Sequence, residues 1–368
     1  MRGSLEAHFP DRVPTPDRPL RVAITVDPNF PVPPILYGGI ERIADFLARG
    51  LATRGHQVTL FAHPESNTAG KLVPYGVPPH VGARSRATEL AQLGVGLWTR
   101  RSEFDLVHSF GRLAALLPIL PYRRVGKLQS YQRDAVPWRS VDIATRLAGD
   151  SIRFTGCSTS VYSQGPPNVG RWHTVFNGAD LSKYDYNPTV AADAPLVFLG
   201  RIERIKGVHS AIAIARRSGR RLVIAGNKVT DGPEPDYFER EVAPHLGGDS
   251  ISYIGPVDDV QKNALLGSAA GFLMPIEWEE AFGIVMAEAL ACGTPVIGFA
   301  RGSVPEVVRE GVNGFVCRNV DDAVRAVAKL GDLSRAMVRS DCEARFSDHA
   351  IVNAYIALYQ DLRDAITD

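Results

Sequence analysis

Short apolar runs of strand length alternate with helical stretches along the chain, and this alternation is the feature that most restricts the fold. The runs cover residues 20–27, 57–62, 104–108, 125–130, 152–158, 173–177, 195–200, 221–225, 251–254, 271–276, 295–298 and 315–317. Strands that alternate with helices predict parallel sheets with helices on their faces. A helix is predicted over residues 40–54, because apolar residues recur every three or four positions and Gly55 follows. It would join the first two strands in a βαβ unit.

The length of the chain predicts two domains. A single hydrophobic core rarely serves more than roughly 250 to 300 residues, and this chain has 368. We expect one doubly wound parallel sheet in residues 20–180 and another in residues 194–347. Residues 181–193 are polar and rich in turn formers, which predicts a hinge, with the ligand bound between the two halves. Residues 1–19 carry four prolines among charges and predict a flexible extension.

The composition excludes several classes of protein. The 41 basic and 40 acidic residues nearly cancel, so a nucleic-acid partner is not expected. The four cysteines form no C-x-x-C pair, which argues against zinc and a disulfide framework and favours the reducing cytoplasm. The longest apolar segment, residues 113–120, is far shorter than the roughly 20 residues that span a bilayer. No transmembrane segment is expected, while peripheral membrane contact through an amphipathic surface stays open.

Two carboxylates, Glu280 and Glu288, flank the predicted start of a helix between two strand-like runs. Gly283 lies near the turn into this helix, where free backbone N–H groups form an anion site that suits a phosphate. These N–H groups belong to Phe282, Gly283, Ile284 and Val285. Each glutamate could then accept hydrogen bonds from hydroxyls on one side of the phosphate, a ribose or a hexose. An isolated pair of glutamates is more often a solvated surface feature of an amphipathic helix.

The string around these glutamates resembles a family signature. Glu280-x7-Glu288 followed by Ala-Leu-Ala-Cys-Gly-Thr-Pro-Val-Ile is similar to the signature of retaining glycosyltransferases of family GT4, and the likeness is most specific at residues 277–298. The resemblance implies a GT-B fold, in which two Rossmann-like domains face each other across a cleft. It also implies transfer of a hexosyl unit from a nucleoside diphosphate sugar, UDP- or GDP-linked, to a hydroxyl acceptor with retention of configuration. In that family a C-terminal helix, here residues 348–366, packs back on the first domain.

The resemblance assigns roles at the two glutamates and at two glycine-containing turns. Glu280 would bind hydroxyls of the donor sugar, and Glu288 those of the ribose. Gly38 and Gly39 follow a proline-rich loop at the start of the first helix, and the family places such a pair against the donor diphosphate. By itself a Gly-Gly pair is weak evidence for a phosphate-binding turn.

A second turn supplies positive charge. Gly200 ends a strand, and Arg201 and Lys206 follow it at a spacing that can clamp a diphosphate. This string resembles the Gly-Arg-x4-Lys-Gly element of GT4 enzymes, although two solvated loop cations are the alternative from spacing alone. The sequence contains no Asp-x-Asp to hold a divalent metal, so protein cations would stabilise the leaving group. We therefore expect neither a metal nor a cofactor, with Arg201, Lys206 and Glu280 as the catalytic residues.

The acceptor and the nucleobase leave weaker signals. His108 lies where GT4 chains often carry a histidine that faces the cleft, but a buried structural histidine is the alternative. Gln132 and Arg133 stand where the family often has a Thr-x-His-Asp string. Gln132 can bind a sugar hydroxyl, and Arg133 could meet an anionic acceptor. Val257 belongs to a strand end where backbone groups would face the nucleobase. The acceptor itself, whether a sugar, a lipid-linked molecule or another small molecule, is left open.

Other functions remain as alternatives. A nucleotide-sugar 2-epimerase of the same fold, or a non-catalytic nucleotide-sugar-binding protein, would keep the same cleft. A glycoside hydrolase also uses two carboxylates, but the strand, loop and helix context with cations disfavours it. A Rossmann dehydrogenase is disfavoured because the chain has no Gly-x-Gly-x-x-Gly fingerprint.

Overall fold

The computed structural model describes residues 18–34, 38–76, 83–133, 135–231, 233–248 and 250–367, which form two parallel sheets. The first sheet has seven strands in the order β3-β2-β1-β4-β5-β6-β7. Its strands are β1 (Arg21–Thr25), β2 (Gln57–Ala62), β3 (Lys71–Pro74), β4 (Leu106–Ser109), β5 (Gly126–Tyr131), β6 (Ile152–Gly156) and β7 (Trp172–Thr174). The second sheet has six strands in the order β10-β9-β8-β11-β12-β13. They are β8 (Leu196–Leu199), β9 (Leu222–Ala225), β10 (Ile251–Tyr253), β11 (Gly271–Met274), β12 (Val296–Phe299) and β13 (Gly314–Cys317).

The expectation of two parallel-sheet α/β domains is confirmed. Every predicted apolar run overlaps a strand, and the predicted first helix is α1 (Gly39–Thr53). The remaining α-helices are α2 (Ala83–Thr99), α3 (Trp138–Ala148), α4 (Val208–Ser218), α5 (Asp259–Gly267), α6 (Ile284–Ala291), α7 (Val304–Val307), α8 (Val320–Val327), α9 (Arg335–Phe346) and α10 (Asp348–Thr367). The edge strand β3 was not predicted, because it is only partly buried and carries no apolar run.

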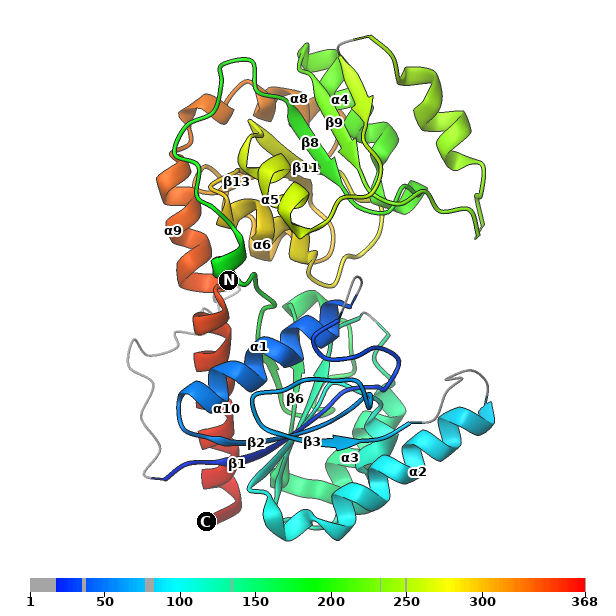
Figure 1. The fold of residues 1–368 in the computed structure, drawn as a ribbon, viewed down its shortest axis with the longest axis vertical. Helices are drawn as coiled ribbons and strands as arrows, with labels where there is room; N and C mark the ends of the chain where they lie inside the picture. Colours follow the sequence, from blue (N-terminus) through cyan, green and yellow to red (C-terminus); the bar gives the residue numbers. More distant parts are fainter. Residues whose placement is uncertain are drawn as a thin grey trace.

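The last helix returns to the first domain. Figure 1 shows α10 (red) beside the first sheet, although it follows α9 (orange) of the second domain. Its buried residues, Tyr355, Tyr359 and Leu362 among them, share one core with α1 and with strands of the first sheet. The first domain is therefore completed by residues from the far end of the chain.

The carboxyl ends of the strands in the first sheet lie against the second domain. Just after β6, the Ser158 hydroxyl donates to the Ala281 carbonyl at 2.6 Å. The Glu306 carboxylate of α7 accepts the backbone N–H groups of Thr159 and Ser160, at 2.7 and 2.9 Å. These contacts hold the loop before α6 against the first domain, which is where the candidate residues lie.

Candidate active site

Glu280 lies in the loop between β11 and α6, and Glu288 lies in the second turn of α6. Gly283 precedes the helix with a φ of 71°, a conformation that favours glycine, and this allows the sharp entry into α6. The first N–H groups of the helix have no acceptor within it, so the turn at Ile284 and Val285 offers donors to an anion. The Phe282 side chain is buried against Phe176 and Phe346, which anchors this turn.

Lys206 is the cation that reaches Glu280. Its Nζ lies 2.6 Å from Glu280 Oε2, and both side chains are largely shielded, with 17% and 11% exposed. The same ammonium lies 4.6 Å from the centre of the Trp278 ring, an additional cation–π contact. Arg201 does not join this pair, because its side chain is 52% exposed and binds Glu203 Oε1 at 2.7 Å. Of the two cations predicted to clamp the diphosphate, Lys206 therefore lies at Glu280 and Arg201 does not.

Both residues of the clamp stand on turns that the backbone fixes. Gly200 directly follows β8, and its N–H donates to the Ala225 carbonyl at 3.1 Å. Gly207 directly follows Lys206 with a φ of 75°, and a Cβ there would lie 1.8 Å from the Pro275 carbonyl oxygen. Only glycine fits this contact, which holds Lys206 next to the loop that carries Glu280.

Glu288 is held through one of its two oxygens. The Tyr184 hydroxyl donates to Oε1 at 2.6 Å, and Lys262 Nζ lies 2.7 Å from the same atom. Burial and the charge of Glu288 raise the pKa of the Tyr184 hydroxyl, so the tyrosine stays a donor. Within the part of the chain that the structure describes, Oε2 has no partner. This oxygen is free to accept hydroxyl groups of a ligand.

The glycines at the start of α1 face the start of α6. A Cβ on Gly39 would lie 3.3 Å from Ile284 Cδ1, so the two helix N-termini come close across the domains. A Cβ on Gly38 would lie 2.8 Å from Glu41 Oε2, so this turn is packed closely against the first turn of its own helix. Two facing helix N-termini concentrate positive potential, which suits a diphosphate between them.

His108 does not face the cleft. It is fully buried, with Nδ1 2.6 Å from the Tyr359 hydroxyl of α10 and Nε2 2.7 Å from Ser130 Oγ. Burial lowers the pKa of the ring to about 3, so it is neutral at ordinary pH. The expectation of acceptor contact at His108 is therefore not met in this structure, and its role is to join β4 to α10.

Unpaired polar groups gather at the carboxyl edge of the first sheet. Thr25, Ser109 and Gln129 pair in register on adjacent strands, and each has a buried oxygen without a partner among the described residues. Beyond them, the Tyr131 hydroxyl and both amide atoms of Gln132 are also buried and unpaired there. Buried polar groups are normally satisfied, so these atoms indicate a place for ordered water or a hydroxylated ligand.

Charged groups flank this edge. Arg133 is exposed, as expected for a residue that could meet an acceptor. Burial raises the pKa of the Asp27 and Glu41 carboxyl groups, an effect that Arg133 partly offsets. Arg112 lies between two carboxylates, 3.8 Å from Asp27 and 3.8 Å from Glu89. The first-domain side of the site therefore combines neutral and charged hydrogen-bonding groups.

Val257 lies in the loop between β10 and α5, where it is half-buried. The loop ends in a capping box, in which the Asp258 side chain and the Gln261 side chain each bind the other's backbone N–H. This fixes the loop beside Lys262, one turn into α5, and leaves it near the Glu288 pair.

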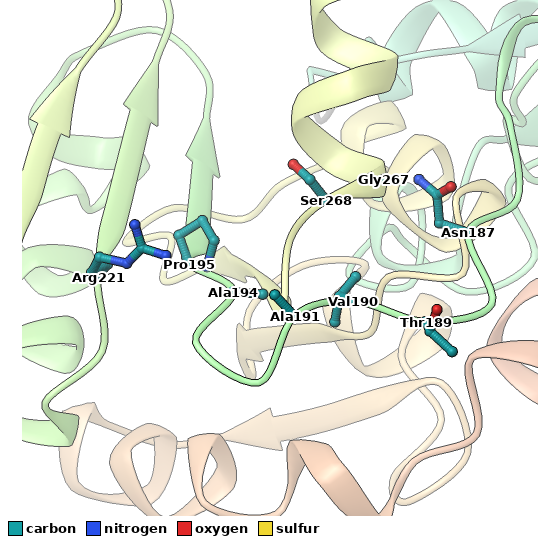
Figure 2. Close-up of a pocket in the computed structure, with 9 residues that line it drawn as sticks. All are labelled: Asn187, Thr189, Val190, Ala191, Ala194, Pro195, Arg221, Gly267 and Ser268. Carbon is teal, nitrogen blue, oxygen red and sulfur yellow. The ribbon is translucent and has the colours of Figure 1, made fainter.

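A hollow elsewhere on the second domain lies away from this chemistry. Figure 2 shows its lining residues, which include Asn187, Pro195 and Arg221. Pro195 and Arg221 directly precede β8 and β9, so the hollow lies at the amino ends of these strands, opposite to Glu280. The hollow therefore lies at the opposite end of the strands from the two glutamates.

Sequence reasoning missed four residues that shape the site: Tyr184, Lys262, Trp278 and Gly302. Tyr184 and Lys262 lie 104 and 26 residues away from Glu288 in the sequence, and no local pattern predicts either contact. Gly302 supports the Glu280 loop, and Ser303 after it donates its N–H to the Glu280 carbonyl at 2.9 Å. The position of Gly302, four residues after the predicted strand at 295–298, was the only signal for it in the sequence.

In the described ranges, no group of three or more His, Cys, Asp or Glu side chains is arranged to hold a metal ion. The described helices include none with the length and apolar character needed to cross a bilayer.

Comparison with known proteins identifies the family. Residues 37–131 match the family model described as Glycosyltransferase Family 4, and residues 190–343 match the model described as Glycosyl transferases group 1. A glycogen synthase of Mycobacterium tuberculosis is 26% identical, with 86% of this chain and 88% of that protein covered. A D-inositol 3-phosphate glycosyltransferase of Mycobacterium bovis is 29% identical, with 72% of this chain and 58% of that protein covered.

Solved structures agree with the family models. AviGT4, a glycosyltransferase involved in avilamycin A biosynthesis, has a TM-score of 0.70 and 25% identity, with 94% of this chain and 98% of that one covered. A sucrose-phosphate synthase has a TM-score of 0.72 at 18% identity, with 94% of this chain and 100% of that one covered, and it supports the fold alone. With the two facing parallel-sheet domains, these matches show that the chain belongs to glycosyltransferase family 4 and is a glycosyltransferase of GT-B fold.

Proposed function

We propose that this enzyme transfers a hexosyl unit from a nucleoside diphosphate sugar, UDP- or GDP-linked, to a hydroxyl acceptor, with retention of configuration and without a metal. The observation that carries the proposal is the arrangement around the two glutamates. Lys206 and the N-termini of α1 and α6 supply positive charge between Glu280 and Glu288, and Glu288 keeps one oxygen free. The donor diphosphate would lie between the two carboxylates.

Each residue then has a role that its contacts support. Glu288 Oε2 accepts the ribose hydroxyls, and the Val257 loop lies against the nucleobase. Gly38, Gly39, Gly200 and the turn from Phe282 to Val285 surround the diphosphate. Glu280 accepts hydroxyls of the hexose. As the bond from the sugar to the phosphate breaks, Lys206 and the helix N-termini stabilise the growing negative charge, and Arg201 joins them by turning from Glu203.

The acceptor would bind at the carboxyl edge of the first sheet. The unpaired atoms of Gln132 and Tyr131 and the exposed Arg133 lie there, on the side of the cleft that faces the donor loop. A hydroxyl that attacks on the face of the sugar from which the phosphate leaves can pass its proton to that phosphate. This edge favours a transferase over the 2-epimerase alternative, because an epimerase needs no acceptor site. The four cysteines are buried free thiols, which suits a reducing compartment such as the cytoplasm.

The test uses donor binding and turnover. A nucleotide that binds only the folded protein raises its melting temperature, so we expect stabilisation by at least one of UDP, GDP, ADP and their hexose conjugates. Glu288→Ala should weaken nucleotide binding about tenfold, the loss of one good hydrogen-bonded contact. Glu280→Gln should bind the nucleotide normally and slow donor turnover, measured as nucleoside diphosphate release, by about a hundredfold.

Glu103→Gln provides the control, since this exposed glutamate pairs with Arg100 just before β4, at the amino end of the first sheet. It should match the wild type in both measurements. If none of the nucleotides stabilised the protein, or if both glutamate variants turned over normally, the proposed site would be wrong.

A further inference from the structure

A continuous chain of ion pairs crosses from the first domain to Glu288. Arg42 lies on α1, one turn after Gly38, and its Nη1 is 3.1 Å from Asp259 Oδ2. Asp259 is the first residue of α5 in the second domain, and its Oδ1 lies 3.3 Å from Lys262 Nζ. Lys262 Nζ in turn lies 2.7 Å from Glu288 Oε1. Asp259 and Lys262 thus connect Arg42 of α1 to Glu288, the glutamate that is predicted to bind the ribose.

The middle of this chain is shielded from solvent. The side chains of Lys262 and Glu288 are 14% and 12% exposed, whereas Arg42 and Asp259 at the domain boundary are 31% and 41% exposed. Shielded charges interact more strongly than surface pairs, which water and salt screen. Although burial opposes it, the charges of Lys262 and Arg42 hold the pKa of Asp259 below its ordinary value. The aspartate is therefore a stable anion between cations of both domains.

The geometry also fixes the direction in which Glu288 can act. Lys262 and Tyr184 both occupy Oε1, so the carboxylate cannot rotate without losing two short contacts. Only Oε2 is left for a ligand. A lysine without a partner on its other side could follow either carboxylate oxygen, but Asp259 holds the ammonium in place from the far side.

We propose that Lys262 is a positioning residue that orients Glu288 toward the ribose of the donor, and that the Arg42–Asp259 pair couples this orientation to contact between the two domains. The ribose part rests on the proposed function. The coupling follows from linkage: if domain contact stabilises the orientation that binds ribose, then ribose binding stabilises domain contact by the same factor. Lys183, in the predicted hinge, adds a further cation to the same aspartate, with its ammonium 3.7 Å from Asp259 Oδ2.

The positioning role is tested by Lys262→Met, which keeps the apolar stem and removes the charge. For whichever of UDP, GDP and ADP stabilises the wild type most, we expect Kd to rise about tenfold. The decisive quantity is the ratio of Kd for the 2′-deoxy and 3′-deoxy nucleotides to Kd for the ribonucleotide. This ratio should fall toward one in the variant, because a misoriented Glu288 no longer accepts hydrogen bonds from the ribose hydroxyls. An unchanged ratio would overturn the positioning role, even if overall affinity dropped.

The coupling is tested by a double-mutant cycle with Arg42→Gln, Asp259→Asn and the double variant. Each single variant should weaken nucleotide binding severalfold, and the double variant should be no weaker than the worse single variant. Arg217→Gln with Asp321→Asn is the matched control, because this pair also joins an arginine to the first turn of another helix but lies within the second domain. The control variants should leave Kd unchanged.

A second readout does not depend on any nucleotide. The four native cysteines are buried, so spin labels can be placed on exposed sites of the two domains with Glu65→Cys and Lys329→Cys. Arg42→Gln and Asp259→Asn should each broaden or lengthen the label distance in the nucleotide-free protein, and the control pair should not. Unchanged distances together with additive effects on Kd would overturn the coupling. If no nucleotide bound the wild type, the ribose role would fail with the proposed function, while the label distances would still decide the contact between domains.

Discussion

At the scale of single residues, His108 shows how burial changes what a histidine can do. Its folded-state pKa of about 3 lies below the ordinary value of 6.5 because the ring is desolvated. Between these values the unfolded chain binds the proton and the folded chain does not, so stability falls as the pH drops below 6.5. The loss approaches about 1.4 kcal/mol per pH unit in this window. In urea titrations from pH 7 to pH 4, His108→Gln should lose stability less steeply than the wild type. If the free energy of unfolding fell equally steeply with pH in the two proteins, the low pKa would not belong to His108.

His108 also shows which features of the site could not be predicted from the sequence. Residue types, local spacing and the resemblance to the family signature together indicated Glu280, Glu288 and Lys206, because a helix start and a glycine turn are local structures. Whether His108 faces the cleft depends on Tyr359, a partner 251 residues away, and no local pattern carries that information. The pairing of Glu288 with Tyr184 was hidden for the same reason.

At the scale of elements, the loop that carries Glu280 depends on a glycine in the next loop. Gly302 has a φ of 52°, and a Cβ there would lie 2.3 Å from the Glu280 carbonyl oxygen. Gly302→Ala must therefore push the Glu280 loop aside, and we expect donor turnover to fall at least tenfold. Gly311→Ala is the control: its φ is 72°, but no atom lies within 4 Å of the added Cβ. It should cost about 1 kcal/mol of stability and leave turnover unchanged. Equal turnover in the two variants would show that the loop is not held in this way.

Strands and helices were the most predictable part of this fold. Each buried strand is an apolar run between turn formers, so a local pattern identifies it. The edge strand β3 was missed because pairing with β2, rather than burial, holds Lys71 and Pro74 in place. The contact between Gly302 and Glu280 could not be predicted either. It joins two loops, and loops on a shared scaffold carry no periodic signal.

At the scale of the whole molecule, the first domain is completed by a helix that follows the second domain in sequence. Leu362 of α10 is fully buried, and a Cβ on Gly126 of β5 would lie 2.9 Å from its Cγ, so the helix packs directly on the first sheet. Leu362→Ala should cost about 3 kcal/mol, the usual price of emptying a buried leucine site. Because the two domains need not unfold together, the measurement is hydrogen exchange followed by mass spectrometry. Protection should fall in β1, β4 and β5 and stay unchanged in β8, β11 and β12, while Asp364→Ala, an exposed change on the same helix, should alter neither set. Loss of protection in the second sheet instead would mean that α10 stabilises the domain it follows in sequence rather than the one it contacts.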